Sequence, residues 1–140
     1  MSQENVENLR AVLEAWNPDA WIRGEADGDA GIALFDPEVA YEDTILPDHV
    51  GETYRGHEGV ARAAERWAEP YASLTIELEQ IVVVGERLVS IHQIRAKARH
   101  SGIEFEGPLA YLWTFRDGKV IHFRSYGDSE QAIEAAGVPE

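Results

Sequence analysis

The last third of the chain, residues 101–137, constrains the fold more than any other part of the sequence. Aromatic and β-branched residues dominate on both sides of Asp117-Gly118, which is typical of pleated strands. We expect a tight hairpin turn at Asp117-Gly118, because glycine readily adopts the positive φ that such turns require. Asp128 or Ser129 can then cap a short helix. The segment therefore predicts two long antiparallel strands followed by a C-terminal helix.

Earlier in the chain, helices are predicted to precede strands. Apolar residues recur at intervals of three and four over residues 6–16 and again over 57–69, as they do in helices with one buried face. Two further long strands are expected on either side of a turn at Gly85-Glu86. Helices followed by four long strands predict an α+β fold with the helices on one face of an antiparallel sheet.

The segments between these elements are less regular. Residues 32–35 predict a final helical turn, which Asp36-Pro37 breaks, and residues 39–43 predict a short strand. For residues 19–30 both a helix and a loop remain open. Residues 44–55 predict a long irregular connection, and connections of this length often line or cover a pocket.

Composition limits the class of protein. The chain has 140 residues, which fits one domain over 1–140, and it has no cysteine and a net charge of −14. Without cysteine it has no disulfide or thiolate site, so a reducing cytoplasm is the expected compartment. An acidic N-terminus and the lack of any apolar run near ~18 residues predict neither a signal peptide nor a membrane anchor. The charge argues against a nucleic-acid partner, because such binding needs clustered Lys and Arg.

Several short segments together resemble the SnoaL-like branch of the NTF2-like superfamily. They are NVE at 5–7, EAWN at 14–17, FDPEV at 35–39, GHEGV at 56–60, SGIE at 101–104, WTFRDGKV at 113–120 and AIEAAG at 132–137. The resemblance covers nearly the whole chain and implies a cone: a curved antiparallel sheet wraps around the N-terminal helices, and a short helix follows at the C-terminus. Residues 19–30 look like an insertion relative to that family. The superfamily contains isomerases, cyclases, epoxide hydrolases, dehydratases and non-catalytic proteins, so the resemblance does not specify a reaction.

Strand parity predicts which side chains face the inside of this cone. Arg95, Lys97 and Arg99 cannot cheaply enter an apolar core, so the alternate residues of that strand are expected to face inward. By the same argument, Phe105 and Ile121 are expected to face inward on the last two strands. The predicted chamber is aromatic: Trp16, Phe35, Tyr41, Trp67, Tyr111, Trp113, Phe115 and Phe123.

Few polar groups are expected in this chamber, and they are the candidate site residues: Asp43, His57, His92, Tyr111 and Ser125. Asp43 is either a strand-end carboxylate that caps the next turn or a general base at a hydrophobic wall. His57 either binds a nearby backbone or carboxylate group at the start of a helix or takes part in catalysis. His92 and Tyr111 are either satisfied core residues or ligand contacts. The five histidines show no pair at ligand spacing, so neither a metal nor a cofactor is predicted.

The resemblance also implies roles for single residues. Aligned with ketosteroid isomerases, Asp43 takes the place of their base, Tyr111 lies near their protonated Asp, and Val12 replaces their oxyanion-hole Tyr. One of two donors is then missing, which costs on the order of 10²–10³ in rate. Polyketide cyclases and limonene-type epoxide hydrolases keep a carboxylate where this chain has Ser125. These departures argue against the best-known chemistries of the family.

Three functions are therefore predicted. One is a cofactor-free isomerase, cyclase, lyase or dehydratase that moves a proton on an apolar oxygenated substrate, with Asp43 as base and Tyr111 or His57 as donor. The alternative is a non-catalytic protein that binds a hydrophobic small molecule, or an interaction module whose pocket is filled by its own aromatic residues. The predicted ligand contacts are Trp16, Phe35, Tyr41, Trp67, His92, Trp113, Phe123 and Ser125.

A second copy of the chain is the expected protein partner. The resemblance implies a homodimer built on the outer face of the sheet. Seven basic and three acidic residues lie between Arg87 and Arg124, whereas residues 1–70 carry 16 acidic and five basic residues. We expect the basic outer face to meet acidic residues across a two-fold axis.

Overall fold

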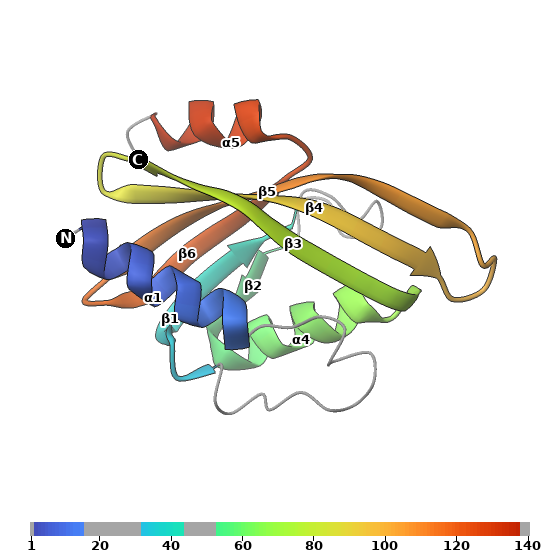
Figure 1. Cartoon of the computed structure of the whole chain (residues 1–140). Helices are drawn as coiled ribbons and strands as arrows, with labels where there is room; N and C mark the ends of the chain where they lie inside the picture. Colours follow the sequence, from blue (N-terminus) through green and yellow to red (C-terminus); the bar gives the residue numbers. More distant parts are fainter. Residues whose placement is uncertain (1, 16–31, 44–52, 138–140) are drawn as a thin grey trace.

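The computed structural model describes residues 2–15, 32–43 and 53–137, apart from the side chains of residues 2, 67 and 68. Its elements, in chain order, are α1 Ser2–Ala15, β1 Phe35–Glu42, β2 Thr53–Arg55, α4 Gly56–Ala68, β3 Tyr71–Val84, β4 Arg87–Ala98, β5 Glu104–Arg116, β6 Lys119–Tyr126 and α5 Ser129–Ala136 (Figure 1). Residues 19–30 and 44–52, for which an insertion and an irregular connection were predicted, lie outside the described residues.

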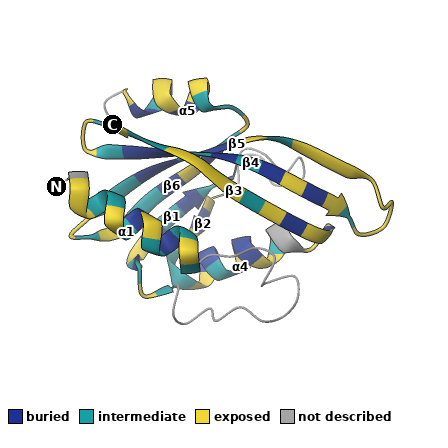
Figure 2. Ribbon diagram, in the orientation of Figure 1, coloured by how far each residue is buried: buried dark blue, intermediate teal, exposed yellow. Residues whose placement is uncertain are grey.

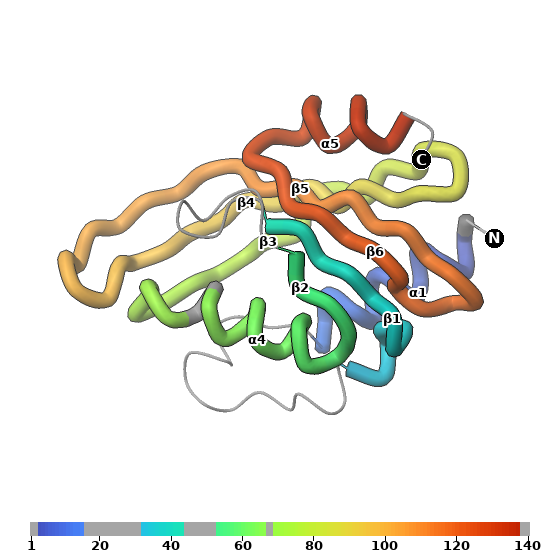
Figure 3. Tube along the Cα trace, turned by 180° about the vertical axis from the view of Figure 1, so that it is seen from behind, coloured from blue at the N-terminus to red at the C-terminus, as the bar shows by residue number. Residues whose placement is uncertain are grey.

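The strands form one six-stranded sheet in the order β2-β1-β6-β5-β4-β3. Strands β1 and β6 are parallel, and all the other neighbours are antiparallel. Figures 1 and 3 show the sheet curving around α1 and α4, with α5 on the opposite face. We call the face that packs against α1 and α4 the inner face and the face under α5 the outer face. This arrangement confirms the predicted α+β architecture.

The helices of the inner face follow from their apolar spacing. On α1, Leu9 and Val12 are buried, and on α4 Val60 is buried with two alanines beside it. Gly59 lets α4 approach β2 closely, because a Cβ at this position would lie 2.9 Å from the carbonyl carbon of Tyr54. Figure 2 shows buried positions on both helices where they face the sheet.

The closing hairpin and helix form as the sequence predicts. Asp117 and Gly118 both have positive φ, at 53° and 81°, as a type I′ turn requires, and the residues on either side of them pair in register. The carboxylate of Asp128 accepts a hydrogen bond from the backbone N–H of Gln131 at 2.8 Å and so caps α5. These local signals are strong because each depends on backbone geometry within a few residues.

The start of β1 differs from the prediction. Phe35 is the first residue of the strand rather than the end of a helical turn, since it pairs with Val120, whose N–H donates to the carbonyl of Leu34 at 3.1 Å. Pro37 lies inside β1, where the register with β6 shifts between Phe35 and Ala40. A ladder irregularity tolerates proline because no regular N–H donor is needed there.

One inward prediction was also wrong, and β2 was missed. Ile121 is the extra residue of an irregularity in β6, so the preceding Val120 enters the core while Ile121 is half-buried. Phe105 lies on the inner face as predicted, because it pairs with Ala96 in an unbroken register and its ring packs against Tyr71. It lies near the end of the β4–β5 hairpin and is 42% exposed. Strand β2 forms within the stretch predicted to be irregular, because Tyr54 pairs with Tyr41 of β1.

The basic residues between Arg87 and Arg124 are largely paired within the chain. Arg95 pairs with Glu106 at 3.2 Å, and Arg116 contacts Asp36 and Glu38 at 3.1 and 2.9 Å. Three other arginines in this range bind backbone carbonyls or a carboxylate of the same chain: Arg87, Arg99 and Arg124. The homodimer through the outer face stays a prediction.

Candidate functional site

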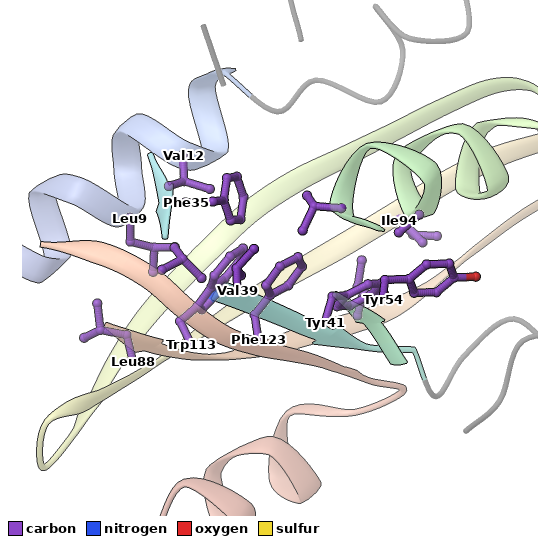
Figure 4. Packing of buried hydrophobic residues seen from close by; sticks show 14 of the residues in the cluster. Leu9, Val12, Phe35, Val39, Tyr41, Tyr54, Leu88, Ile94, Trp113 and Phe123 are labelled. Atoms are coloured by element: carbon purple, nitrogen blue, oxygen red, sulfur yellow. The ribbon is translucent and has the colours of Figure 1, made fainter. Parts of the chain in front are cut away.

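An aromatic row crosses the inner face of the sheet. The register places Leu88, Trp113, Phe123, Tyr41 and Tyr54 side by side on β4, β5, β6, β1 and β2 (Figure 4). The Trp113 and Phe123 rings stack with centroids 4.9 Å apart, and the Phe123 and Tyr41 rings stack at 4.3 Å. Every residue of this row is nearly inaccessible to solvent. The row forms a rigid apolar wall inside the cone.

A polar row lies beside the aromatic row, two residues away from it on each of β4, β5, β6 and β1. Ser90, Tyr111 and Ser125 lie on β4, β5 and β6, and Asp43 directly follows β1. The two-residue step keeps these side chains on the inner face, because successive residues of a strand alternate between faces. Asp43 is 1% exposed, and both serines are fully buried. The sheet thus gathers four polar side chains beside the aromatic row.

Within the polar row, Ser125 and Asp43 are direct neighbours. The hydroxyl of Ser125 donates to Oδ1 of Asp43 over a long 3.5 Å contact, so β6 helps to orient the carboxylate at the end of β1. Asp43 was predicted to face the inside of the cone, and its burial confirms this. Its burial against aromatic residues makes it a carboxylate that a bound molecule could meet without competition from bulk water.

Tyr111 lies between Ser90 and Ser125 and keeps part of its surface accessible. Burial raises the pKa of its phenol above the ordinary value, and the charge of Asp43 and the neighbouring Tyr71 raise this pKa further. The pKa of Tyr71 is raised for the same reasons, first by burial and then by Asp43. The hydroxyl of Tyr111 therefore stays protonated at neutral pH and can donate a hydrogen bond.

His92 lies next to the polar row on β4 and is 2% exposed. Its Nε2 lies 2.7 Å from Oγ of Ser90, and Nε1 of Trp113 donates to the same oxygen at 2.8 Å. Burial lowers the pKa of His92 to about 4, so the ring is neutral near pH 7. Nδ1 has no hydrogen-bond partner among the residues that the structure describes. The ring packs edge-on against Tyr111, with centroids 5.7 Å apart.

His57 is placed differently. Its Nε2 lies 2.8 Å from the carbonyl oxygen of Phe35, so the ring links the first turn of α4 to the start of β1. In the described part of the chain, no hydrogen bond joins His57 to the polar row. This geometry matches the interpretation of His57 as the partner of a backbone group at a helix start.

The other predicted contacts divide into three groups. Phe35, Tyr41, Trp113 and Phe123 lie in the inner core, and Ser125 lies in the polar row. Trp16 lies outside the described residues, as does the side chain of Trp67.

The sequence did not identify Ser90 as a candidate site residue, although strand parity predicted that it faces inward. Its position two residues before His92 on one strand was the signal that could have paired them.

Two further findings bear on ligands and on environment. Among residues 2–15, 32–43 and 53–137, no three His, Asp or Glu side chains gather in a way that could hold a metal ion. No helix in the same ranges is both long and apolar enough to cross a membrane.

Comparisons with known proteins agree with this geometry. The chain matches the SnoaL-like domain family over residues 9–123. It is similar to an NTF2-like protein of unknown function from Burkholderia pseudomallei, with 20% identity, a TM-score of 0.71 and coverage of 96% of this chain and 98% of that one. None of the curated protein sequences matches the chain.

Two similar structures were solved with small molecules. TerC, co-crystallised with polyporic acid, is 17% identical, with a TM-score of 0.70 and coverage of 96% of this chain and 99% of that one. A protein with a ketosteroid isomerase-like fold from Catenulispora acidiphila, in complex with trimethylamine, is 18% identical, with a TM-score of 0.67 and coverage of 91% and 93%. At these identities the likeness establishes a shared fold.

Proposed function

Because the chain belongs to the SnoaL-like family, which has the NTF2-like fold, we propose that it binds an apolar, oxygen-bearing small molecule against the polar row and moves a proton on it without a cofactor. The observation that carries the proposal is the pairing of one buried carboxylate, Asp43, with one protonated phenol, Tyr111, beside a wall of aromatic rings. A base and a hydrogen-bond donor on the same face are what enolisation requires.

The chemistry follows from these two groups. A carboxylate oxygen of Asp43 removes a proton from the carbon next to a carbonyl group. The electron pair of that C–H bond forms a C=C bond, and the carbonyl π electrons move to oxygen. The O–H of Tyr111 donates a hydrogen bond to this oxygen and stabilises its negative charge. The carboxylic acid then returns the proton to the same carbon or to a conjugated one, which regenerates the carboxylate.

The aromatic row provides the surroundings of the site in this proposal. The buried rings of Trp113, Phe123 and Tyr41 stack on one another and form a rigid apolar wall beside the polar row, which suits an apolar ligand. The small molecules bound by TerC and by the Catenulispora protein support a ligand-binding role for this fold. Tyr111, the one partly accessible member of the polar row, is the side chain that such a molecule would reach first.

Deuterium exchange tests the proposal without a known substrate. We would incubate 2-acetylnaphthalene with the protein in D2O and follow the loss of its methyl proton signal by NMR. We expect catalysed exchange with the wild type, and a loss of at least about 100-fold in rate for Asp43→Asn. Tyr111→Phe should lower the rate by on the order of 10²-fold, because a donor to the developing charge is lost.

Glu42→Gln is the matched control, since Glu42 is the neighbouring carboxylate but pairs on the surface with His122 and Arg124. Its exchange rate should equal that of the wild type. Equal rates for Asp43→Asn and the wild type would refute the role of Asp43 as the base.

A second function, binding without chemistry, is favoured by Ser125. This residue stands where several relatives are expected to keep their carboxylate, and Asp43 is the sole buried acid of the described chain. Stabilisation of the wild type by 2-acetylnaphthalene in a thermal-shift assay, without catalysed exchange, would select this function over the enzyme.

A further inference from the structure

The hydrogen bonds of Ser90 determine which ring nitrogen of His92 carries the proton. The indole N–H of Trp113 can only donate, so Oγ of Ser90 accepts this bond at 2.8 Å. The hydroxyl hydrogen of Ser90 then needs an acceptor, and Nε2 of His92 lies 2.7 Å away. Ser90 is fully buried, where an unused O–H is costly. Nε2 therefore accepts from Ser90, and in the neutral ring the proton lies on Nδ1.

This assignment leaves a buried donor on the inner face. The Nδ1–H of His92 has no partner among the described residues, although the side chain is 2% exposed. Buried polar groups in proteins are nearly always hydrogen-bonded, so an exception needs an explanation. The hydrogen bonds that link Trp113 to Ser90 and Ser90 to His92 hold the ring in one orientation.

The free donor lies next to a second one. The His92 ring meets Tyr111 edge-on at 5.7 Å between centroids, and the O–H of Tyr111 stays protonated at neutral pH. Tyr111 retains accessible surface, so a molecule that reaches Tyr111 arrives beside His92. Two neutral donors close together on an apolar wall suit an acceptor oxygen. They do not suit an ammonium group, which has only donors to offer.

We propose that His92 is a ligand-binding residue whose Nδ1–H donates to a carbonyl or enolate oxygen of the bound molecule, together with Tyr111. This inference rests on the proposed function, because it assigns the oxygen-binding end of the same site. It restricts the ligands of the site to ketones, esters, quinones and similar oxygen acceptors.

The first test needs no ligand. In protein labelled with ¹⁵N-histidine, we expect the resonances of His92 at pH 7 to show a protonated Nδ1 and an unprotonated Nε2. His92→Gln identifies these resonances by their loss, and the exposed His100→Gln serves as an assignment control. A proton on Nε2 would overturn the inference.

The second test uses two probes that differ only in the oxygen. 2-Acetylnaphthalene carries a carbonyl group, and 2-isopropenylnaphthalene carries a CH₂ group in its place. We expect the wild type to bind the ketone about tenfold more tightly than the alkene, as one net hydrogen bond allows. His92→Gln, which can still bind Ser90 but lacks a donor at the Nδ1 position, should reduce this ratio to about one. His92→Asn, whose amide nitrogen takes the Nδ1 position, should keep most of the preference.

The outcomes separate this inference from the proposed function. Tight binding of both probes without preference for the ketone would refute the role of His92, while the proposed binding site would still stand. Binding of neither probe would count against the proposed function itself, and the inference would fall with it. Thermal melts of each variant show whether it remains folded.

Discussion

The two faces of the same strands differ in the polarity of their buried side chains. On β5, Leu109, Tyr111 and Trp113 face inward, while Ala110 and Leu112 face outward under α5. The outer cluster is apolar and made mostly of small side chains: Val89, Ala110, Leu112, Ala132 and Ala136. Among the described residues, the buried polar side chains are Asp43, Ser90, His92 and Ser125, and all belong to the inner face.

This difference shows how a site can be recognised without a ligand. Burial of a polar group costs free energy unless it is hydrogen-bonded, so a face used only for packing excludes such groups. The outer face follows this rule. The inner face buries four polar side chains. One of their atoms, Nδ1 of His92, has no hydrogen-bond partner in the described chain. We expect substitutions on the two faces to separate stability from ligand binding.

The largest expected effect compares two leucines of β5. Leu109→Ala and Leu112→Ala should each lower the free energy of unfolding by about 2–5 kcal/mol, because both side chains are nearly fully buried. Leu109 pairs with His92 in the register, so Leu109→Ala should also weaken binding of 2-acetylnaphthalene. Leu112→Ala should leave it unchanged. Urea denaturation and a binding titration measure the two quantities, and equal loss of binding in both variants would contradict the division of the faces.

The second prediction concerns pH and the inner face alone. The pKa of His92 is about 4 in the folded chain and 6.5 as its ordinary value, so the unfolded chain binds this proton more readily. The contribution of His92 to stability is present above pH 6.5 and is lost as the pH falls from 6.5 towards 4. Over this range the loss is about 3 kcal/mol.

Urea denaturation at pH 7 and pH 4.5 checks this value through the difference between the wild type and His92→Gln. Other titrating groups are common to both proteins and cancel in the comparison. His100→Gln, an exposed histidine, should lose stability as the wild type does. A wild type no more sensitive to acid than His92→Gln would show that His92 is not held neutral by burial.

The smallest effect belongs to the outer layer. Asp128→Ala removes the side-chain oxygen that accepts from Gln131 and should lower the free energy of unfolding by about 1 kcal/mol. Asp128→Asn should restore most of this stability, because asparagine caps a helix about as well. Neither variant should change deuterium exchange into 2-acetylnaphthalene. Reduced exchange in Asp128→Ala, at a temperature where it stays folded, would indicate coupling between α5 and the inner face.

Local signals explain what was predicted correctly. The Asp117-Gly118 turn and the Asp128 cap depend on backbone geometry within a few residues, and both form as expected. Strand parity was correct for Asp43, His92 and Ser125, because alternation survives wherever a strand is regular. Parity failed at Ile121, where an irregularity in β6 shifts the alternation by one residue. At Phe105 the alternation holds, but the side chain is 42% exposed because it lies near the end of a hairpin.

By itself, then, the sequence determined the α+β class, the closing hairpin with its helix, and the set of polar residues that face inward. Alternation, turn chemistry and capping are local, so they can be read along the chain. Only the tertiary structure decided that Ser90, Tyr111, Ser125 and Asp43 form one row. It also decided that Nδ1 of His92 has no hydrogen-bond partner in the described part of the chain. Register between distant strands and the partner of each buried atom depend on how the whole sheet assembles, and no local pattern records either.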